Sequence, residues 1–413
     1  MARIIVVGGS LGGLMAANLL ARAGHAVQVL EKAPASLDGR GAGIVAHRPL
    51  LATLADCGVK VDTDLGIAVK GRVALDQGGC PIDSLEMPQI LTSWSRLYAL
   101  LIAAFKGQPY LHGVTVTSVA QSAHGATVLC GDGRTFEADL VVASDGIRSA
   151  VRAQLLPDSQ PHYAGYIAWR GICEEADLSE FTRQSVFERF GFGLPPGEQL
   201  IGYPVAGAGH AVRAGQRRYN YVWYRPAADD HLRQLMTDAD GHYFEQGIPP
   251  HKVAAQHVTA MRLSARALLA PQFAEMIDKT AQPFLQPIYD CTSASMAFGR
   301  VALMGDAAFV ARPHVGMGVT KAAEDAAALA QSIAALGATP AALQAFEAGR
   351  LGPCQAVVQR GRDLGAYLQS HRGSAPSRPH CDSSSAQRAR QVMLETAVDL
   401  SALPTTRISA LSC

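Results

Sequence analysis

A glycine-rich turn between an apolar segment and a helix-like segment restricts the fold most strongly. Residues 4–7 (IIVV) predict a buried strand, and the turn VVGGSLGGL covers Val6–Leu14. The Ala- and Leu-rich stretch Leu11–Ala23 predicts a helix that stops at Gly24. A second apolar run, Val27–Leu30, completes a βαβ unit, whose two strands we expect to be parallel.

The glycine spacing in this turn is typical of a dinucleotide-binding loop. In the pattern G-x-G-x-x-G started at Gly8, Ser10 takes the second glycine position and Gly13 the third. We expect Gly8 to make the turn, Gly13 to let the helix pack on the strand, and the Ser10 hydroxyl to bind a phosphate oxygen. Glu31 ends the second strand 18 residues after Gly13, where an acid would accept hydrogen bonds from a ribose.

The same stretch also matches the nucleophile elbow G-x-S-x-G of α/β-hydrolases, from Gly8 to Gly12. A hydrolase nucleophile normally follows several strands, however, and Glu31 would then have no role. We therefore favour the dinucleotide interpretation. A glycine turn in some other α/β fold remains an alternative.

The composition excludes several other classes of protein. With 413 residues, 48% hydrophobic and 17% charged, the chain predicts a well-buried core in two domains or one elaborated α/β unit. The net charge of +1, without a basic block, argues against a nucleic-acid partner. There is no signal peptide pattern and no long apolar run, so we expect a soluble, cytoplasmic protein without membrane contact. The scattered cysteines and the pair His251 and His257 do not predict a metal site.

The middle of the chain has a different pattern from its ends. Aromatic and polar residues alternate there, as in YIAWRGI and RRYNYVWYRP, which predicts antiparallel strands with one buried face. A buried strand at 300–305 and an Ala-rich helix at 320–336 then follow. The predicted fold class is α/β, with a Rossmann-like domain interrupted by an antiparallel β-sheet domain. We assign 1–72, 89–162 and 291–370 to the first domain, 73–88 and 163–290 to the second, and 371–413 to a tail with a linker and a helix at 386–400.

Two later motifs place acidic residues at the ends of strands. In ADLVVASDGIRSAVR, the strand Leu140–Ala143 leads to Asp145-Gly146. In GRVALMGDAAFVARPHVGMGVTKAAEDA, a strand ends at Gly305-Asp306, and a loop rich in proline and glycine leads to a helix. A carboxylate at such a place can accept hydrogen bonds from hydroxyl groups, and the helix N-terminus behind it can face a polar ring edge.

Together, these motifs resemble those of the class A FAD-dependent flavoprotein monooxygenases, the aromatic hydroxylase family, over roughly residues 1–370. The segments YAGYIAWRG, LIGYP and RPH are similar to the branch that contains 2,6-dihydroxypyridine 3-hydroxylase. The resemblance implies FAD as the cofactor, with Asp145-Gly146 near FAD and the reduced pyridine nucleotide, and Gly305-Asp306 on the ribityl chain. The implied cofactor-binding residues are Gly8, Ser10, Leu11, Gly13, Glu31, Lys32, Arg40, Arg96, Asp145, Gly146, Gly305, Asp306, Pro313, Gly316, Gly318 and Val319.

Three residues depart from the family pattern around the last motif. Phe309 stands where many members have histidine, Met317 where they have glutamine, and Thr320 where they often have asparagine. The Gly-Asp pair itself is intact. We therefore expect FAD binding to be retained and the polarity of the pocket over the isoalloxazine ring to differ.

The resemblance further implies an NAD(P)H-dependent monooxygenase that forms a flavin C4a-hydroperoxide with O2. We expect it to hydroxylate a hydroxylated N-heteroaromatic ring such as 2,6-dihydroxypyridine, with NADH favoured and a homodimer as the assembly. A phenolic or hydroxybenzoate-type substrate, a flavin oxidoreductase without oxygen insertion and a regulatory flavin- or nucleotide-binding protein are the alternatives.

A base or donor network near the ring would favour the deprotonated hydroxyarene. The candidates are His314, His47 and Tyr203, although each also suits a structural position. Arg170 suits an anion anchor or a salt bridge on the strand surface. The residues expected in the sheet core, with pocket lining as the alternative, are Trp169, Tyr221, Trp223 and Tyr224.

Overall fold

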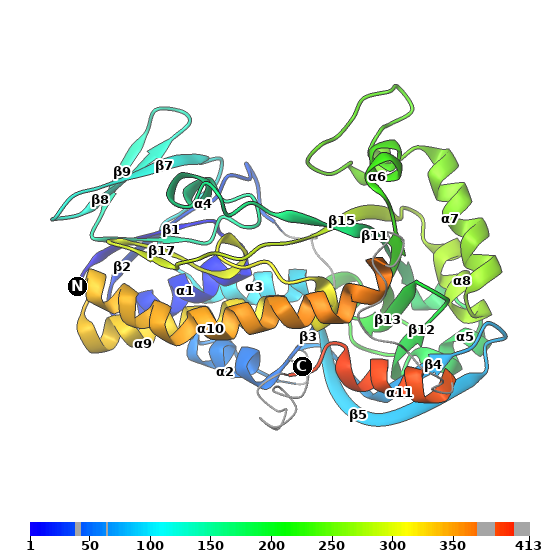
Figure 1. Ribbon diagram of the computed structural model, residues 1–413. Helices are drawn as coiled ribbons and strands as arrows, with labels where there is room; N and C mark the ends of the chain where they lie inside the picture. Colours follow the sequence, from blue (N-terminus) through cyan, green and yellow to red (C-terminus); the bar gives the residue numbers. More distant parts are fainter. Residues whose placement is uncertain (38–42, 63–64, 370–384, 400–413) are drawn as a thin grey trace.

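The computed structural model describes residues 1–37, 43–62, 65–369 and 385–399 (Figure 1). The predicted fold class is confirmed, because a mostly parallel sheet covered by helices lies beside a larger, mostly antiparallel sheet. A third sheet of three strands completes the described β-structure. No described helix is long and apolar enough to cross a membrane.

The six-stranded sheet contains the predicted βαβ unit. Its order is β16-β17-β10-β1-β2-β6, and β1 pairs in parallel with both β2 and β10. The helix α1 (Leu11–Arg22) connects β1 to β2 and is followed by Gly24 at a φ of +87°, as the sequence predicts. The strands are β1 (Arg3–Val7), β2 (Ala26–Leu30), β6 (Tyr110–Leu111), β10 (Leu140–Ala143), β16 (Ala297–Phe298) and β17 (Val301–Leu303).

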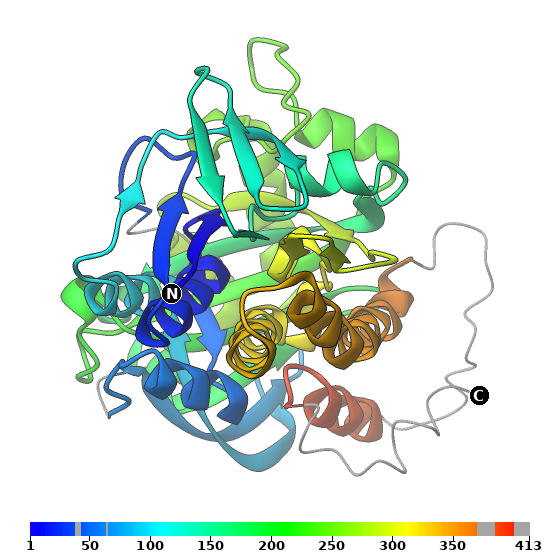
Figure 2. The same ribbon diagram turned by 90° about the vertical axis from the view of Figure 1, so that its left-hand side faces the viewer.

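This sheet is the middle of three layers, which Figure 2 shows from the side. Helices α1, α3 (Trp94–Ala104) and α9 (Gly318–Leu336) form the layer on one face, and α2 (Arg48–Asp56) and α10 (Pro340–Gly365) pack against α9. The other face carries a small antiparallel sheet and the short helix α4 (Ala150–Leu155). That sheet consists of β7 (Val116–Gln121), β8 (Ala126–Cys130) and β9 (Thr135–Ala138).

The eight-stranded sheet has the order β15-β11-β14-β13-β12-β4-β5-β3. All its neighbours pair antiparallel except β12 and β4, which run parallel. It therefore joins an N-terminal group of strands to a later group. The strands are β3 (Gly43–Val45), β4 (Ile67–Leu75), β5 (Pro81–Ser93), β11 (His162–Glu174), β12 (Arg189–Gly193), β13 (Gln199–Val205), β14 (Arg218–Pro226) and β15 (Phe284–Asp290).

The sequence predicts antiparallel strands throughout residues 163–290, whereas the structure has both strands and helices there. The alternating pattern of 163–290 does not continue through it, because helices occupy much of the second half. Met261, Ala265 and Leu269 are buried at every fourth position, which is the period of a helix rather than a strand. The sheet also extends beyond the predicted 73–88, since it includes β3 and all of β4 and β5. The helices are α5 (Glu180–Val186), α6 (Asp229–Leu235), α7 (Ala255–Leu268) and α8 (Pro271–Lys279).

The two faces of the larger sheet have different neighbours. One face packs its apolar side chains against those of α6, α7 and α8. The other face carries Phe190, Phe192, Tyr203 and Tyr224, and it packs against α11 (Ser385–Glu395). Figure 1 shows α11 in red beside β4 and β5. This helix starts one residue before the predicted one and ends five residues earlier, and most of the predicted linker lies outside the described residues.

A buried carboxylate joins the two long helices to the last strand of the six-stranded sheet. Asp325 in α9 has no exposed surface, and its Oδ2 accepts a hydrogen bond of 3.0 Å from Gly305 N. Its Oδ1 accepts one of 2.8 Å from Arg350 Nε in α10, and Lys321 Nζ lies 3.7 Å from Oδ2. The carboxylate therefore holds the turn after β17 against both helices.

Replacement of this carboxylate should be costly. We expect Asp325→Asn to lower the free energy of unfolding by about 3–5 kcal/mol, because it leaves the fully buried ammonium of Lys321 without its ion-pair partner. Urea unfolding measures the change. The control is Glu188→Gln, which removes an exposed ion pair with Lys70 and should cost less than about 1 kcal/mol. Equal effects of the two variants would contradict the assigned role of Asp325.

Candidate functional site

The N-terminal turn is built so that only glycine fits at two positions. Gly8 has a φ of +94°, and a Cβ there would lie 2.4 Å from Ser144 O. A Cβ on Gly13 would lie 1.9 Å from Gly8 O, so the helix packs directly on the turn. Ser10 is the N-cap residue of α1 but makes no side-chain cap hydrogen bond. Its hydroxyl and the first N–H groups of α1 therefore have hydrogen-bonding capacity for a phosphate.

Glu31 holds the glycine loop from the end of β2. Its carboxylate is buried, with Oε2 accepting from Gly9 N and Oε1 accepting from Ala33 N, both at 2.8 Å. A carboxylate has about four acceptor positions, so this one can also accept hydrogen bonds from a ribose. Of its predicted companions, Lys32 is exposed and Leu11 is buried in the core.

The other two motifs meet the glycine turn around Ser144. A Cβ on Gly12 would lie 3.2 Å from Ser144 Oγ, and one on Gly305 would lie 3.7 Å from it. Arg152 then ties the two motif loops together, since its guanidinium donates to Ile147 O, Asp306 O and Ala307 O. The sequence analysis assigned no role to Ser144 or Arg152, although both lie within the quoted Asp-Gly motif.

The acids of these motifs lie in desolvated places. Burial raises the pKa of the Asp145 carboxyl, whose Oδ2 caps α4 through Ala150 N at 2.9 Å. The buried Oδ1 of Asp145 has no hydrogen-bond partner among the described residues. Desolvation also raises the pKa of the Asp306 carboxyl, although this side chain is solvent-accessible.

A guanidinium near α3 has unused hydrogen-bonding capacity. Arg96 Nε is buried and has no hydrogen-bond partner in the described part of the chain. Arg40, the other predicted arginine, lies outside the described residues. The N-terminus of α1 and Arg96 supply donors for a pyrophosphate, and Glu31 and Asp306 supply acceptors for hydroxyl groups. This donor and acceptor set fits FAD.

The loop before α9 carries the remaining predicted cofactor residues. Pro313 begins a short helical turn, and Gly316 follows in the left-handed conformation with a φ of +64°. Gly318 begins α9 with open space at its Cβ position, next to the half-buried Val319. The first turn of α9 has no side-chain cap, so its N–H groups are also available to a polar ring edge.

Two of the three residues that depart from the family pattern, Phe309 and Met317, are apolar neighbours of this loop. Phe309 is fully buried in the core of the six-stranded sheet. Met317 packs against Val315 and Val357 in a small apolar cluster. Neither side chain therefore adds polarity to the loop.

Two of the three candidate bases, His314 and Tyr203, form hydrogen bonds within the aromatic face of the larger sheet. His314 has no exposed surface, with Nδ1 2.8 Å from Gln199 Oε1 and Nε2 3.0 Å from Tyr166 Oη. Burial lowers its pKa to about 3, so the ring is neutral. The Tyr203 hydroxyl donates to Gly43 O at 2.9 Å, and burial raises its pKa to about 12. Both side chains fix the aromatic face of the larger sheet.

His47 has a different environment, although it is also buried. It is the N-cap residue of α2, and its Nδ1 lies 3.0 Å from Thr320 Oγ1 at the start of α9. Its Nε2 lies 3.4 Å from Ala397 O, so Nε2 donates and Nδ1 accepts. Desolvation by burial lowers the pKa of His47, and the ring is therefore neutral near pH 7.

The sequence analysis missed Arg72, which lies on β4 and has no exposed surface. Its guanidinium donates to Gln89 Oε1 and to the carbonyl oxygens of Met393, Thr396 and Ala397. Burial lowers its pKa to about 9, so it remains charged at neutral pH. No local pattern could identify this residue, because the carbonyl oxygens to which it donates belong to residues more than 300 positions later.

The other residues singled out in the sequence divide between the two faces of the larger sheet. Trp169, Tyr221 and Trp223 lie in the core beneath α6–α8, while Tyr224 lies on the other face, 4.0 Å from the His314 ring centre. Arg170 makes no salt bridge within the described ranges, and its Nη1 donates to Gln286 Oε1 at 2.6 Å.

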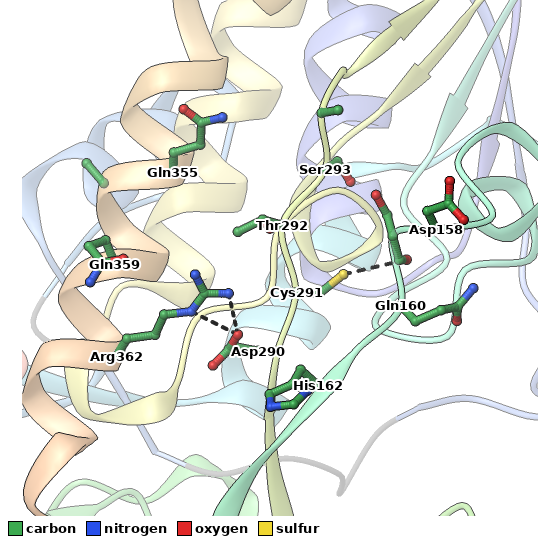
Figure 3. A pocket seen from close by; sticks show the side chains of 13 residues that line it. Asp158, Gln160, His162, Asp290, Cys291, Thr292, Ser293, Gln355, Gln359 and Arg362 are labelled. Atoms are coloured by element: carbon green, nitrogen blue, oxygen red, sulfur yellow. Dashed lines mark hydrogen bonds and ion pairs between the residues drawn. The ribbon is translucent and has the colours of Figure 1, made fainter. Parts of the chain in front are cut away.

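One cavity is separate from these residues. Figure 3 shows a cavity of about 710 Å³ between α10 and the end of β15, where Arg362 pairs with Asp290. Gln355 and Gln359 also line it from α10. No predicted site residue lines this cavity, and no described group of His, Cys, Asp or Glu could hold a metal ion.

Comparisons with known proteins agree with this geometry. A family model described as FAD binding domain matches residues 1–64, and one described as FAD binding domain-like matches residues 163–290. The chain is 30% identical to 2,6-dihydroxypyridine 3-monooxygenase from Paenarthrobacter nicotinovorans over 379 residues, covering 91% of this chain and 94% of the relative. It is 31% identical to aurachin C monooxygenase/isomerase from Stigmatella aurantiaca over 362 residues, covering 84% and 85%.

A solved structure extends this similarity to the whole fold. The 2,6-dihydroxypyridine-3-hydroxylase from Arthrobacter nicotinovorans superimposes with a TM-score of 0.84 at 30% identity, covering 92% of this chain and 95% of that chain. The similarity thus includes both large sheets. The chain therefore belongs to the aromatic hydroxylase family of FAD-dependent flavoprotein monooxygenases, and FAD is its cofactor.

Proposed function

We propose that the protein uses NAD(P)H and O2 to hydroxylate a hydroxylated N-heteroaromatic ring such as 2,6-dihydroxypyridine. The observation that carries this proposal is the 30% identity, over nine tenths of both chains, to a protein named for that reaction. FAD supplies the redox chemistry that activates O2 when it is bound. The side chains of this protein bind the cofactor, exclude water from the reacting ring and move the substrate's proton.

The predicted cofactor residues divide the binding of FAD among three loops. The N-terminus of α1 with Ser10 would bind the pyrophosphate, and Glu31 would accept hydrogen bonds from the ribose. Asp306 would hold the ribityl hydroxyls, and Arg96 would donate to the cofactor through its unpaired Nε. Arg152 would position two of the loops rather than bind FAD, because its donors are engaged with backbone carbonyls.

His47 is the residue that we assign as general base. A neutral imidazole with a lowered pKa can accept a proton at neutral pH. When Nε2 no longer donates to Ala397 O, the ring proton can lie on Nδ1 and be donated to Thr320 Oγ1, which leaves Nε2 free to take a proton. His314 and Tyr203 suit this role less well. Burial lowers the pKa of His314 to about 3, which makes it a weak base, and Tyr203 stays protonated below about pH 12.

The reaction itself can be tested by mass spectrometry. We expect a panel of hydroxypyridines and hydroxybenzoates, supplied with NADH or NADPH and isotopically labelled O2, to yield a labelled hydroxypyridine. Pyridine nucleotide oxidation without label in any ring would contradict the hydroxylase function. Label in the hydroxybenzoates alone would contradict the proposed substrate class.

The assignment of the pyrophosphate site depends on Ser10. We expect Ser10→Gly to keep FAD, since glycine is smaller and suits the turn. Ser10→Leu should lose it, because a bulky side chain blocks the approach to the helix N-terminus. The ratio of FAD to protein after purification, read from flavin absorbance, measures the outcome. A leucine variant that stays yellow would show that this turn does not bind the pyrophosphate.

The role of His47 predicts a change in rate and in pH dependence. His47→Gln should lower kcat for hydroxylation by about 10²–10⁴-fold. Wild-type activity should fall as the pH drops through the lowered pKa of His47, below 6.5, and this acidic limb should be absent in the variant. The control His124→Gln changes an exposed histidine and should keep both rate and profile. An unchanged acidic limb in His47→Gln would exclude His47 as the base.

A further inference from the structure

Three side-chain nitrogens converge on a single carbonyl oxygen beside the loop before α9. Ala397 O lies 3.0 Å from Arg72 Nη2, 3.3 Å from Gln89 Nε2 and 3.4 Å from His47 Nε2. These side chains come from β4, from β5 and from the start of α2. A neutral carbonyl has two lone pairs, so three donors, one of them charged, suit an oxygen that carries a negative charge better.

The guanidinium in this group lacks an anionic partner. Arg72 forms no ion pair within the described ranges. Its remaining acceptors are the neutral oxygens Gln89 Oε1, Met393 O and Thr396 O. The rings of Phe190 and Phe192 lie 5.2 and 5.9 Å from its central carbon. A desolvated cation among aromatic rings gains more from an anion than from carbonyl groups, because the charges are poorly screened there.

The residue that supplies the carbonyl is held against the loop before α9. Ala397 N donates to His314 O at 3.0 Å, and a Cβ on Gly316 would lie only 2.5 Å from Ala397 Cβ. Ala397 adopts a φ of +50°, a left-handed conformation that is unfavourable for alanine. The segment can therefore leave this position with relief of backbone strain.

We propose that Arg72, Gln89 and His47 form a subsite for the ionised ring oxygen of the aromatic substrate, which the Ala397 carbonyl fills until substrate binds. The inference rests on the proposed function and names the group of the substrate that is recognised. The substrate hydroxyl displaces Ala397 O, and the ring proton of His47 then moves from Nε2 to Nδ1, which donates to Thr320 Oγ1. The freed Nε2 takes the proton of the substrate hydroxyl. Arg72 and Gln89 then hold the resulting oxygen anion beside the imidazolium.

The helix α11 keeps this segment in place. Ala389 and Met393 have no exposed surface and pack on the aromatic face of the larger sheet, whereas Gln391 on the same helix is exposed. Displacement of the segment thus requires only that the residues after α11 move, or that α11 loosens from the sheet.

Hydrogen exchange on the FAD-loaded enzyme tests the displacement directly. The probe is 2,6-dihydroxypyridine, added without O2 or NAD(P)H. We expect exchange of the Ala397 amide to rise at least about tenfold when the probe binds, because its hydrogen bond to His314 O is lost. Unchanged or slower exchange with bound probe would overturn the proposal, since it would mean that the segment stays or closes over the ligand.

A matched pair of variants on α11 tests the competition. Ala389→Lys places a charge in the packed face and should lower the Kd for the probe about tenfold, since the carbonyl no longer competes. Gln391→Lys puts the same side chain on the exposed face and should leave the Kd within about twofold. Arg72→Gln should raise the Kd by about tenfold or more, through loss of the charged donor. Equal Kd values for the two lysine variants would contradict the proposal.

The outcomes separate this inference from the proposed function. Binding of the probe with unchanged exchange, followed by hydroxylation of the ring, would overturn the subsite alone. Binding with faster exchange at Ala397 but no labelled product would overturn the hydroxylase function alone. Absence of binding to wild type and to Ala389→Lys would overturn both.

Discussion

The guanidinium of Arg152 links the two acidic motifs at the edge of the six-stranded sheet. It is buried and donates to backbone carbonyls of the loops after β10 and β17, so the two strand ends keep a fixed separation. The close approach of Gly13 to Gly8 sets the third loop against the same edge. The positions of the cofactor-binding groups therefore depend on two kinds of contact. One is the hydrogen bonds from Arg152 to backbone carbonyls, and the other is the close approach of backbone segments at the glycines of the turn.

The cofactor half of the site could be predicted because its signals are local. Gly8, Gly13 and Glu31 lie within one βαβ unit, and the short-range pattern determines both their conformation and their neighbours. The helices α6–α8 were missed for the opposite reason, since a period-two pattern in the flanking strands was extended over residues with a period of four. The strands β4 and β5 extend beyond the predicted 73–88, because strand ends are less marked in sequence than strand centres.

The substrate half depends on contacts between distant parts of the chain. His47, Arg72 and Gln89 approach one another only because β4 and β5 pair and α2 packs against α9. Burial then determines the chemistry of each group. It makes His314 and His47 neutral alike, and it lowers the pKa of the fully buried His314 to about 3. Residue type and spacing do not encode such differences.

The parallel pair β12 and β4 has a consequence for the way the chain acquires its fold. It joins strands that are more than 100 residues apart in the sequence. Arg72, which lies on β4, donates to carbonyl oxygens that belong to α11 and to the residues after it. Pairing over such distances makes folding slow, because long loops must close first. During synthesis, the cation would remain without these carbonyl partners until α11 and the residues after it have left the ribosome. Synthesis of α11 is thus coupled to closure of the aromatic face of the larger sheet.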